Sequence, residues 1–115
     1  MSQFMYLFRG GNDWTKADPT AMQANMQKWV AWMKDLGAKG HFKGSGEPLE
    51  RTGNVVRGKS KTVTDGPYAE AKDIVGGYLL VEAKDLSEAT ELSRGCPLLE
   101  EDGSVEVRAV QKMNM

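Results

Sequence analysis

The sequence is poor in the residues that build metal sites and covalent cross-links, because its 115 residues include one cysteine and one histidine. Cys96 alone cannot form a disulfide within the chain, and His41 with scattered carboxylates shows no metal-ligand spacing. No apolar run reaches the roughly 18 residues that a membrane-spanning helix needs, and the N-terminus has no charged segment followed by an apolar core. We therefore expect a cytoplasmic protein with no metal, no cofactor and no membrane contact.

Excess charge of one sign is also lacking, since the net charge is −1, and this argues against a general nucleic-acid binder. The charges are unevenly spread. Residues 39–61 hold six basic and two acidic residues, whereas residues 65–106 hold eleven acidic and three basic ones. Solvated faces usually explain such asymmetry, and an electrostatic binding patch is the alternative.

The length predicts one domain over residues 1–115.

The pattern of apolar residues predicts two helices separated by strands. Asp18-Pro19 is typical of a helix start, and Asp85 with Glu88 three residues later forms a capping box. The order β, α, several β, α, β predicts an α+β, ferredoxin-like plait, an antiparallel sheet with both helices on one face. The expected strands are 3–9, a short one near 41–43, 54–57, 59–64, 77–83 and 105–110; the expected helices start at Asp18 and Asp85 and end near Gly37 and Arg94.

One broad apolar stripe along the first helix is expected to pack on the sheet. Its members recur at helical spacing, with Trp32 at the edge of the stripe: Met22, Met26, Trp29, Val30, Met33 and Leu36.

The strands at 3–9 and 77–83 carry apolar side chains on both faces. Two helices on one side leave the other face uncovered, and an apolar face of more than a few hundred Å² usually marks an interface. We expect a homodimer formed face to face through the sheets. A monomer with a curled sheet is the alternative.

Residues 53–60 read GNVVRGKS, a match to the phosphate-loop pattern GxxxxGK[ST]. That loop needs a helix opening at the Lys, but the sequence here continues with a β-branched run that ends at Gly66-Pro67. The match is therefore interpreted as coincidence, with Arg57-Gly58 as a hairpin turn.

The stretch TVTDGPYAEAKDIVGG, residues 62–77, holds the main candidates for a site. Asp65 can accept hydrogen bonds from the backbone of a turn, which is the structural interpretation. The functional interpretation places Asp65, Tyr68, Glu70 and Lys72 around a cleft between sheet and helix, for acid–base chemistry or a small polar ligand. His41 is the other catalytic candidate, because any histidine-dependent mechanism must use it. Cys96 follows a helix C-terminus, which disfavours a thiolate, and is interpreted as a packed cysteine.

The phrase TDGPYAEAKDIVGGYLLVEAKDLSEATELSRGCP, with SVEVRAV near the end, resembles the YCII-related superfamily. More narrowly it is similar to the DGPF branch, named for the tetrapeptide that here reads Asp65-Gly66-Pro67-Tyr68. The resemblance covers nearly the whole chain and implies a ferredoxin-like plait of the dimeric α/β-barrel type. Some broader members are proposed to use a His of the first helix and an Asp before a late Pro. Those positions fall near Trp29 and on Cys96 here, so the resemblance implies no reaction class.

The sequence is therefore compatible with two functions. The first is a small-molecule-binding protein, or an enzyme of unassigned reaction, with a pocket between sheet and helices lined by Asp65 and Tyr68 and helped by Glu70, Trp29 and His41. The second is a non-catalytic dimeric module in transcription regulation, because some DGPF relatives are encoded beside alternative sigma factors. The substrate, the regulatory partner and any assembly beyond a dimer are not predicted from the sequence.

Overall fold

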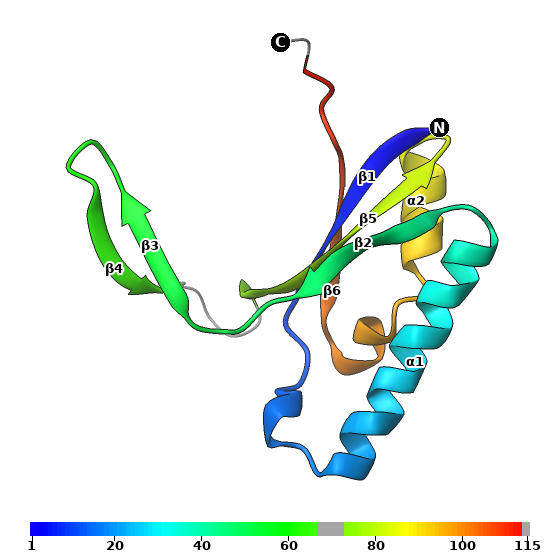
Figure 1. The fold of residues 1–115 in the computed structure, drawn as a ribbon, viewed down its shortest axis with the longest axis horizontal. Coiled ribbons are helices and arrows are strands. Elements are labelled where there is room, and N and C mark those ends of the chain that lie inside the picture. Colours follow the sequence, from blue (N-terminus) through cyan, green and yellow to red (C-terminus); the bar gives the residue numbers. More distant parts are fainter. Residues whose placement is uncertain (67–72, 114–115) are drawn as a thin grey trace.

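A computed structural model describes residues 1–66 and 73–113 of the chain. Its elements are β1 (Ser2–Arg9), η1 (Trp14–Lys16), α1 (Pro19–Ala38), β2 (Phe42–Pro48), β3 (Gly53–Arg57), β4 (Thr62–Gly66), β5 (Val75–Ala83), α2 (Leu86–Ser93), η3 (Pro97–Glu101) and β6 (Ser104–Ala109). The main sheet has the order β2-β5-β1-β6, and every neighbouring pair in it is antiparallel. Both helices lie on the same side of this sheet (Figure 1). The expected ferredoxin-like plait is confirmed.

Local side-chain chemistry defines where both helices begin. The carboxylate of Asp18 accepts a hydrogen bond from the Ala21 N–H at 2.9 Å, and Pro19 occupies the first helical position. At α2, the Glu88 N–H donates to Asp85 at 2.9 Å, while the Glu88 side chain accepts from the Lys84 N–H. Both caps stand where the sequence predicts them.

An aromatic cluster fills the space between the sheet and α1. Tyr6 and Phe8 point from β1 toward the helix, where the Tyr6 ring stacks on Trp32 at a centroid distance of 6.0 Å. The Tyr6 hydroxyl donates to the backbone carbonyl of Ala89, so the same side chain also contacts α2. Burial raises the pKa of the Tyr6 hydroxyl, which therefore stays a donor throughout the ordinary pH range.

The prediction that the apolar stripe of α1 packs on the sheet is wrong at two positions. Met26 is 58% exposed and Val30 is 41% exposed, whereas Trp32, expected at the edge of the stripe, is buried. The helix is rotated toward Trp32 because this side chain stacks on Tyr6 and donates its indole N–H to the Leu92 carbonyl at 3.3 Å. An aromatic ring with a satisfied donor gains more from burial than either Met26 or Val30.

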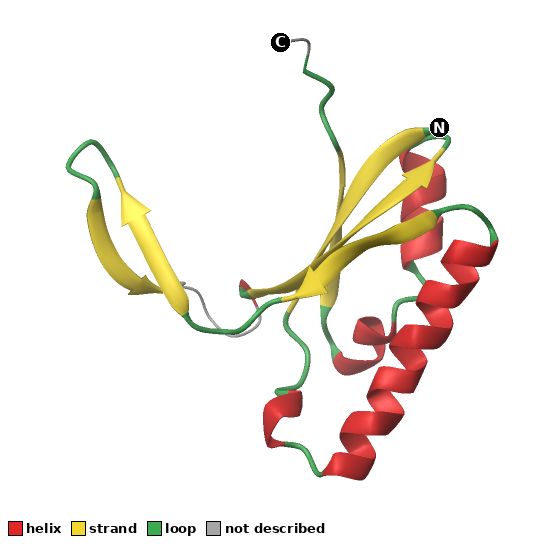
Figure 2. Ribbon diagram, in the orientation of Figure 1, coloured by secondary structure: helices red, strands yellow, loops and turns green. Residues whose placement is uncertain are grey.

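β3 and β4 form a separate two-stranded ribbon, residues 53–66, which we call the arm. It is inserted between β2 and β5, which are themselves neighbours in the main sheet, and the Leu49 N–H donates to the Gly76 carbonyl at its base. The arm projects away from the sheet and both helices (Figure 2). Its tip is a turn in which Gly58 has φ +67° and the Lys61 N–H donates to the Gly58 carbonyl. No helix follows Lys59, so the phosphate-loop match is a coincidence.

Replacing Tyr6 with Phe should lower the free energy of unfolding by about 1–2 kcal/mol, because the Ala89 carbonyl is then buried without its side-chain donor. Urea unfolding at neutral pH measures the loss. Tyr78→Phe is the matched control, since Tyr78 is half-buried on the other face of the sheet and its hydroxyl has no partner among the described residues. Equal losses in both variants would contradict the assignment.

Candidate functional site

Asp65 lies on β4 in the arm, directly opposite Asn54 of β3. Its side chain is exposed, and its carboxylate has no hydrogen-bond or ion-pair partner among the described residues. The N–H groups that the structural interpretation assigns to this carboxylate belong to residues after Gly66, which lie outside the described residues. That interpretation therefore stays a prediction.

His41 sits at the opposite end of β2 from the arm. Its Nδ1 lies 2.7 Å from the Glu82 carbonyl, its N–H donates to the Leu36 carbonyl, and its own carbonyl accepts from the Glu82 N–H. Pro48, where the connection to the arm begins, lies seven positions after His41, which is roughly 20 Å along a strand. Within one chain, His41 and Asp65 therefore do not form an acid–base pair.

Trp29 packs into the aromatic cluster. Its ring meets Phe8 edge to face at 5.0 Å and Trp32 at 5.8 Å. Tyr68, Glu70 and Lys72 lie outside the described residues. The structure thus places Asp65, His41 and Trp29 on three separate parts of the chain rather than around one cleft.

A groove between α1 and η3 does bring polar side chains together. Trp32, Gly95 and Cys96 form its floor, and a Cβ added at Gly95 would lie 3.0 Å from the indole of Trp32. The absence of a side chain at Gly95 therefore lets the indole pack close to the backbone. Charged groups stand around the floor from three segments of the chain: Lys28 and Asp35 from α1, Arg94 after α2, and Glu100 from η3.

The charges around this groove are exposed and loosely paired. Lys28 and Glu100 bridge the groove at 3.1 Å, and Arg94 pairs with Glu91 at 3.3 Å. Exposed ion pairs of this kind contribute little to stability, so their side chains can exchange partners at small cost. The groove therefore offers two cations and two carboxylates above an apolar floor.

Cys96 is inert in this setting. It is 2% exposed, and burial raises the pKa of its thiol from 9.0 to about 12, while a backbone hydrogen bond at Leu98 opposes the shift and the Glu101 carboxylate adds to it. The packed cysteine expected from the sequence is confirmed. A neutral, buried thiol is a poor nucleophile and a poor proton donor at neutral pH.

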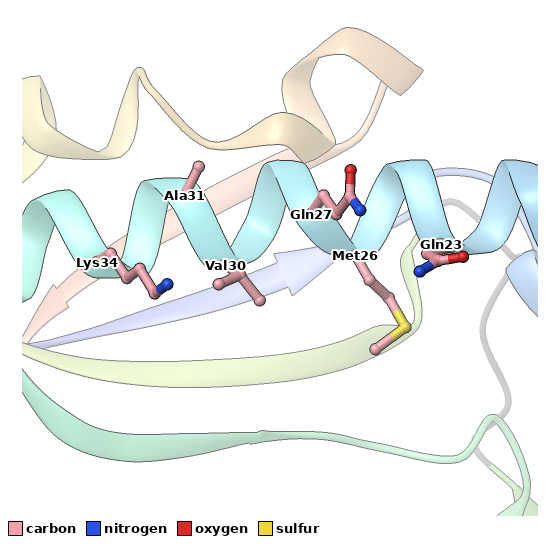
Figure 3. Close-up of a pocket in the computed structure, with 6 residues that line it drawn as sticks. All are labelled: Gln23, Met26, Gln27, Val30, Ala31 and Lys34. Atoms are coloured by element: carbon pink, nitrogen blue, oxygen red, sulfur yellow. The ribbon is translucent and has the colours of Figure 1, made fainter.

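A second depression lies on the outer surface of α1 (Figure 3). All six of its lining side chains come from α1 alone: Gln23, Met26, Gln27, Val30, Ala31 and Lys34. It includes the two residues whose exposure was unexpected, Met26 and Val30. A depression on one helix, with no second element facing it, is a weaker site than the groove.

Among residues 1–66 and 73–113, no three His, Cys, Asp or Glu side chains lie close enough to hold a metal ion. None of the helices in those ranges is long and apolar enough to cross a membrane.

The groove was not foreseen from the sequence, because Lys28, Arg94 and Glu100 are ordinary surface residues far apart in the chain. The one available signal was the capped helix end at Gly95-Cys96-Pro97, which brings the chain back toward α1.

The raised pKa of Cys96 predicts a pH-dependent stability. Because the folded thiol holds its proton between pH 9 and 12 and the unfolded thiol does not, its contribution is complete below pH 9 and is lost as the pH rises. The difference in unfolding free energy between the wild type and Cys96→Ala should therefore shrink by roughly 2 kcal/mol from pH 7.5 to 10.5. Urea unfolding of both proteins across this range measures it. A constant difference would mean that the thiol titrates normally.

Comparisons with known proteins agree with this fold. A solved structure of 5-chloro-2-hydroxyhydroquinone dehydrochlorinase (TftG) from Burkholderia phenoliruptrix AC1100, in complex with 2,5-dihydroxybenzoquinone, is similar with a TM-score of 0.50. The two chains are 16% identical, over 95% of this chain and 93% of that one. No curated protein matches the sequence. The family model of the YCII-related domain matches residues 12–114, and the chain therefore belongs to the YCII-related family.

Proposed function

We propose that this YCII-related chain is a small-molecule-binding protein that acts as a homodimer, with the open faces of two sheets packed together and a ligand held in the groove between α1 and η3. The observation that carries the binding site is the groove itself, where exposed charges from three segments surround a floor of Trp32 and Cys96. Such a mixture of an apolar floor and a few polar groups is typical of sites for small organic molecules. The cytoplasm is the proposed setting, since the single thiol is unpaired.

The similar dehydrochlorinase was solved with a small dihydroxyquinone, and this supports a flat, oxygen-rich ring as the class of ligand. Lys28 and Arg94 could bind an acidic oxygen of such a ring, and the indole of Trp32 could lie against its apolar part. The reaction stays unassigned. The positions of the family's proposed His and Asp fall near Trp29 and on Cys96, and neither an indole nor a neutral thiol exchanges protons readily at neutral pH.

The dimer is supported by the open face of the sheet. Four half-buried apolar side chains lie in two directly opposed pairs, Met5 with Leu80 and Leu7 with Tyr78, at the centre of the two middle strands. Neither α1 nor α2 covers this face (Figure 2). A compact apolar centre on an uncovered sheet is a typical site for a second copy.

Charged pairs surround that apolar centre. Arg9 lies 3.2 Å from Glu106 on one side, and Lys43 lies 2.9 Å from Glu82 on the other. Glu106 is the direct cross-strand partner of Leu7, so the polar ring begins next to the apolar pairs. An apolar core inside a polar rim is the usual anatomy of a protein interface.

Leu7→Lys should convert the dimer to a monomer, because the introduced ammonium would be buried against the apolar centre of the second copy. Sedimentation velocity over a range of protein concentrations measures the effect. Leu86→Lys is the control, since Leu86 is 53% exposed on α2, on the helix side. A wild type that sediments as a monomer at high concentration would contradict the proposed dimer.

Ligand binding is tested by a thermal-shift screen with small aromatic acids, lactones and 2,5-dihydroxybenzoquinone. A compound at 100 times its Kd adds about 2.7 kcal/mol and should raise the melting temperature by several degrees. We expect Arg94→Gln to abolish this rise and Asp65→Asn to keep it, which would identify the groove as the site.

The opposite result, a rise lost in Asp65→Asn and kept in Arg94→Gln, would move the site to Asp65, with Tyr68 and Glu70, which follow it in the sequence, as the other candidates. No stabilisation by any compound would argue against small-molecule binding.

A further inference from the structure

We propose that the arm packs on a second copy of this chain through the face that carries Val56 and Val63. This inference rests on the homodimer proposed above and adds a second element to its interface. It also assigns a role to the arm, which contributes no residue to the described hydrophobic core of its own chain.

The arm is short of stabilising contacts within the chain. It consists of two five-residue strands that pair with each other, and its strands join no other sheet among the described residues. An isolated two-stranded ribbon is marginally stable in water. A ribbon that stays ordered therefore needs a surface to pack on.

Two valines supply an apolar contact face. Val56 and Val63 are direct cross-strand partners, and they are 62% and 60% exposed. Because side chains alternate along a strand, Asn54 and Asp65 share this face with them. The opposite face carries Val55 and Thr64, which are half-buried within the chain. The valine face is thus the one that remains free for a partner.

The base of the arm is anchored to the rest of the chain. Leu49 donates to the Gly76 carbonyl at 2.9 Å, and Arg51 contacts the Asn12 carbonyl at 3.4 Å just before β3 begins. An arm held at its base loses less conformational freedom on binding than a free loop would. Its direction is therefore set before any partner arrives.

Charge favours a second copy as that partner. Residues 53–66 contain three of the fifteen basic residues and one of the sixteen acidic ones, so the arm carries +2 and the rest of the chain carries −3. The three cations, Arg57, Lys59 and Lys61, gather at the tip. Two copies of one chain then offer each other complementary charge, the basic arm of one and the acidic remainder of the other.

The arm is long enough to contact the sheet of a second copy. Five strand residues extend about 16 Å, and a four-stranded sheet is about 14 Å wide between its outer strands. The arm is inserted between the edge strand β2 and its neighbour β5, and β5 carries Leu80 and Tyr78 of the open apolar face. An arm that continues from an interface of two sheets can therefore lie along the second copy.

In this dimer, Asp65 would lie at the contact between the two copies. Its carboxylate stands on the valine face and has no partner within the described part of its own chain. In the dimer it would be presented to the second copy, so its hydrogen-bond partners would be intermolecular.

The test compares dimer dissociation constants, by sedimentation equilibrium, for the wild type and three single-lysine variants of the arm. Val56→Lys and Val63→Lys place a charge on the proposed contact face and should each weaken the dimer tenfold or more. Thr62→Lys is the matched control: it adds the same charge to the same ribbon on the opposite face, and its dissociation constant should stay within about threefold of the wild type.

Hydrogen exchange supplies the second measurement. Amides within residues 53–66 should be protected in the wild-type dimer and lose protection in the Leu7→Lys monomer. Unchanged protection, or a dimer that tolerates both valine substitutions, would overturn the proposal while leaving the sheet-to-sheet dimer intact. Equal weakening by all three arm variants would overturn the assignment of the valine face. A monomeric wild type would overturn the dimer and this inference together.

Discussion

The position of both helices depends on Tyr6, a single side chain on β1, one of the two middle strands of the sheet. Its ring stacks on Trp32 of α1, and its hydroxyl donates to the Ala89 carbonyl of α2. One fully buried residue therefore fixes two helices against one strand. The rotation of α1 follows from this contact, because a helix that buries Trp32 must expose Met26. The groove follows as well, since Trp32 forms its floor.

The same arrangement leaves the molecule incomplete on its other side. Both helices pack on the Tyr6 face, so no helix of the described part of the chain covers the apolar pairs around Leu7 and Leu80. The arm has the same difficulty at its exposed valine pair. A chain that cannot bury these surfaces alone gains by burying them against another molecule. In the proposed dimer, one partner would cover both the open face of the sheet and the valine pair of the arm.

The candidate site combines residues that are far apart in the sequence. The sequence predicts Asp65 and His41 as catalytic candidates because their side chains can exchange protons. In the fold, the whole length of β2 lies between them. The groove draws on Lys28, Arg94 and Glu100, which look like unremarkable surface charges until the fold brings them together. The sequence does not show which charged side chains will be neighbours, because Coulomb interactions depend on distance in space.

The sequence by itself determined the elements and their order. Asp18-Pro19 and Asp85 with Glu88 start the helices by local hydrogen bonds, and short, mostly apolar runs mark the two middle strands, so both signals act within a few residues. Only the tertiary structure decided which face of α1 is buried, that β3 and β4 leave the main sheet as an arm, and which charges surround the groove. These outcomes depend on contacts between distant residues such as Tyr6 and Trp32, and packing energy between them overrides local preference.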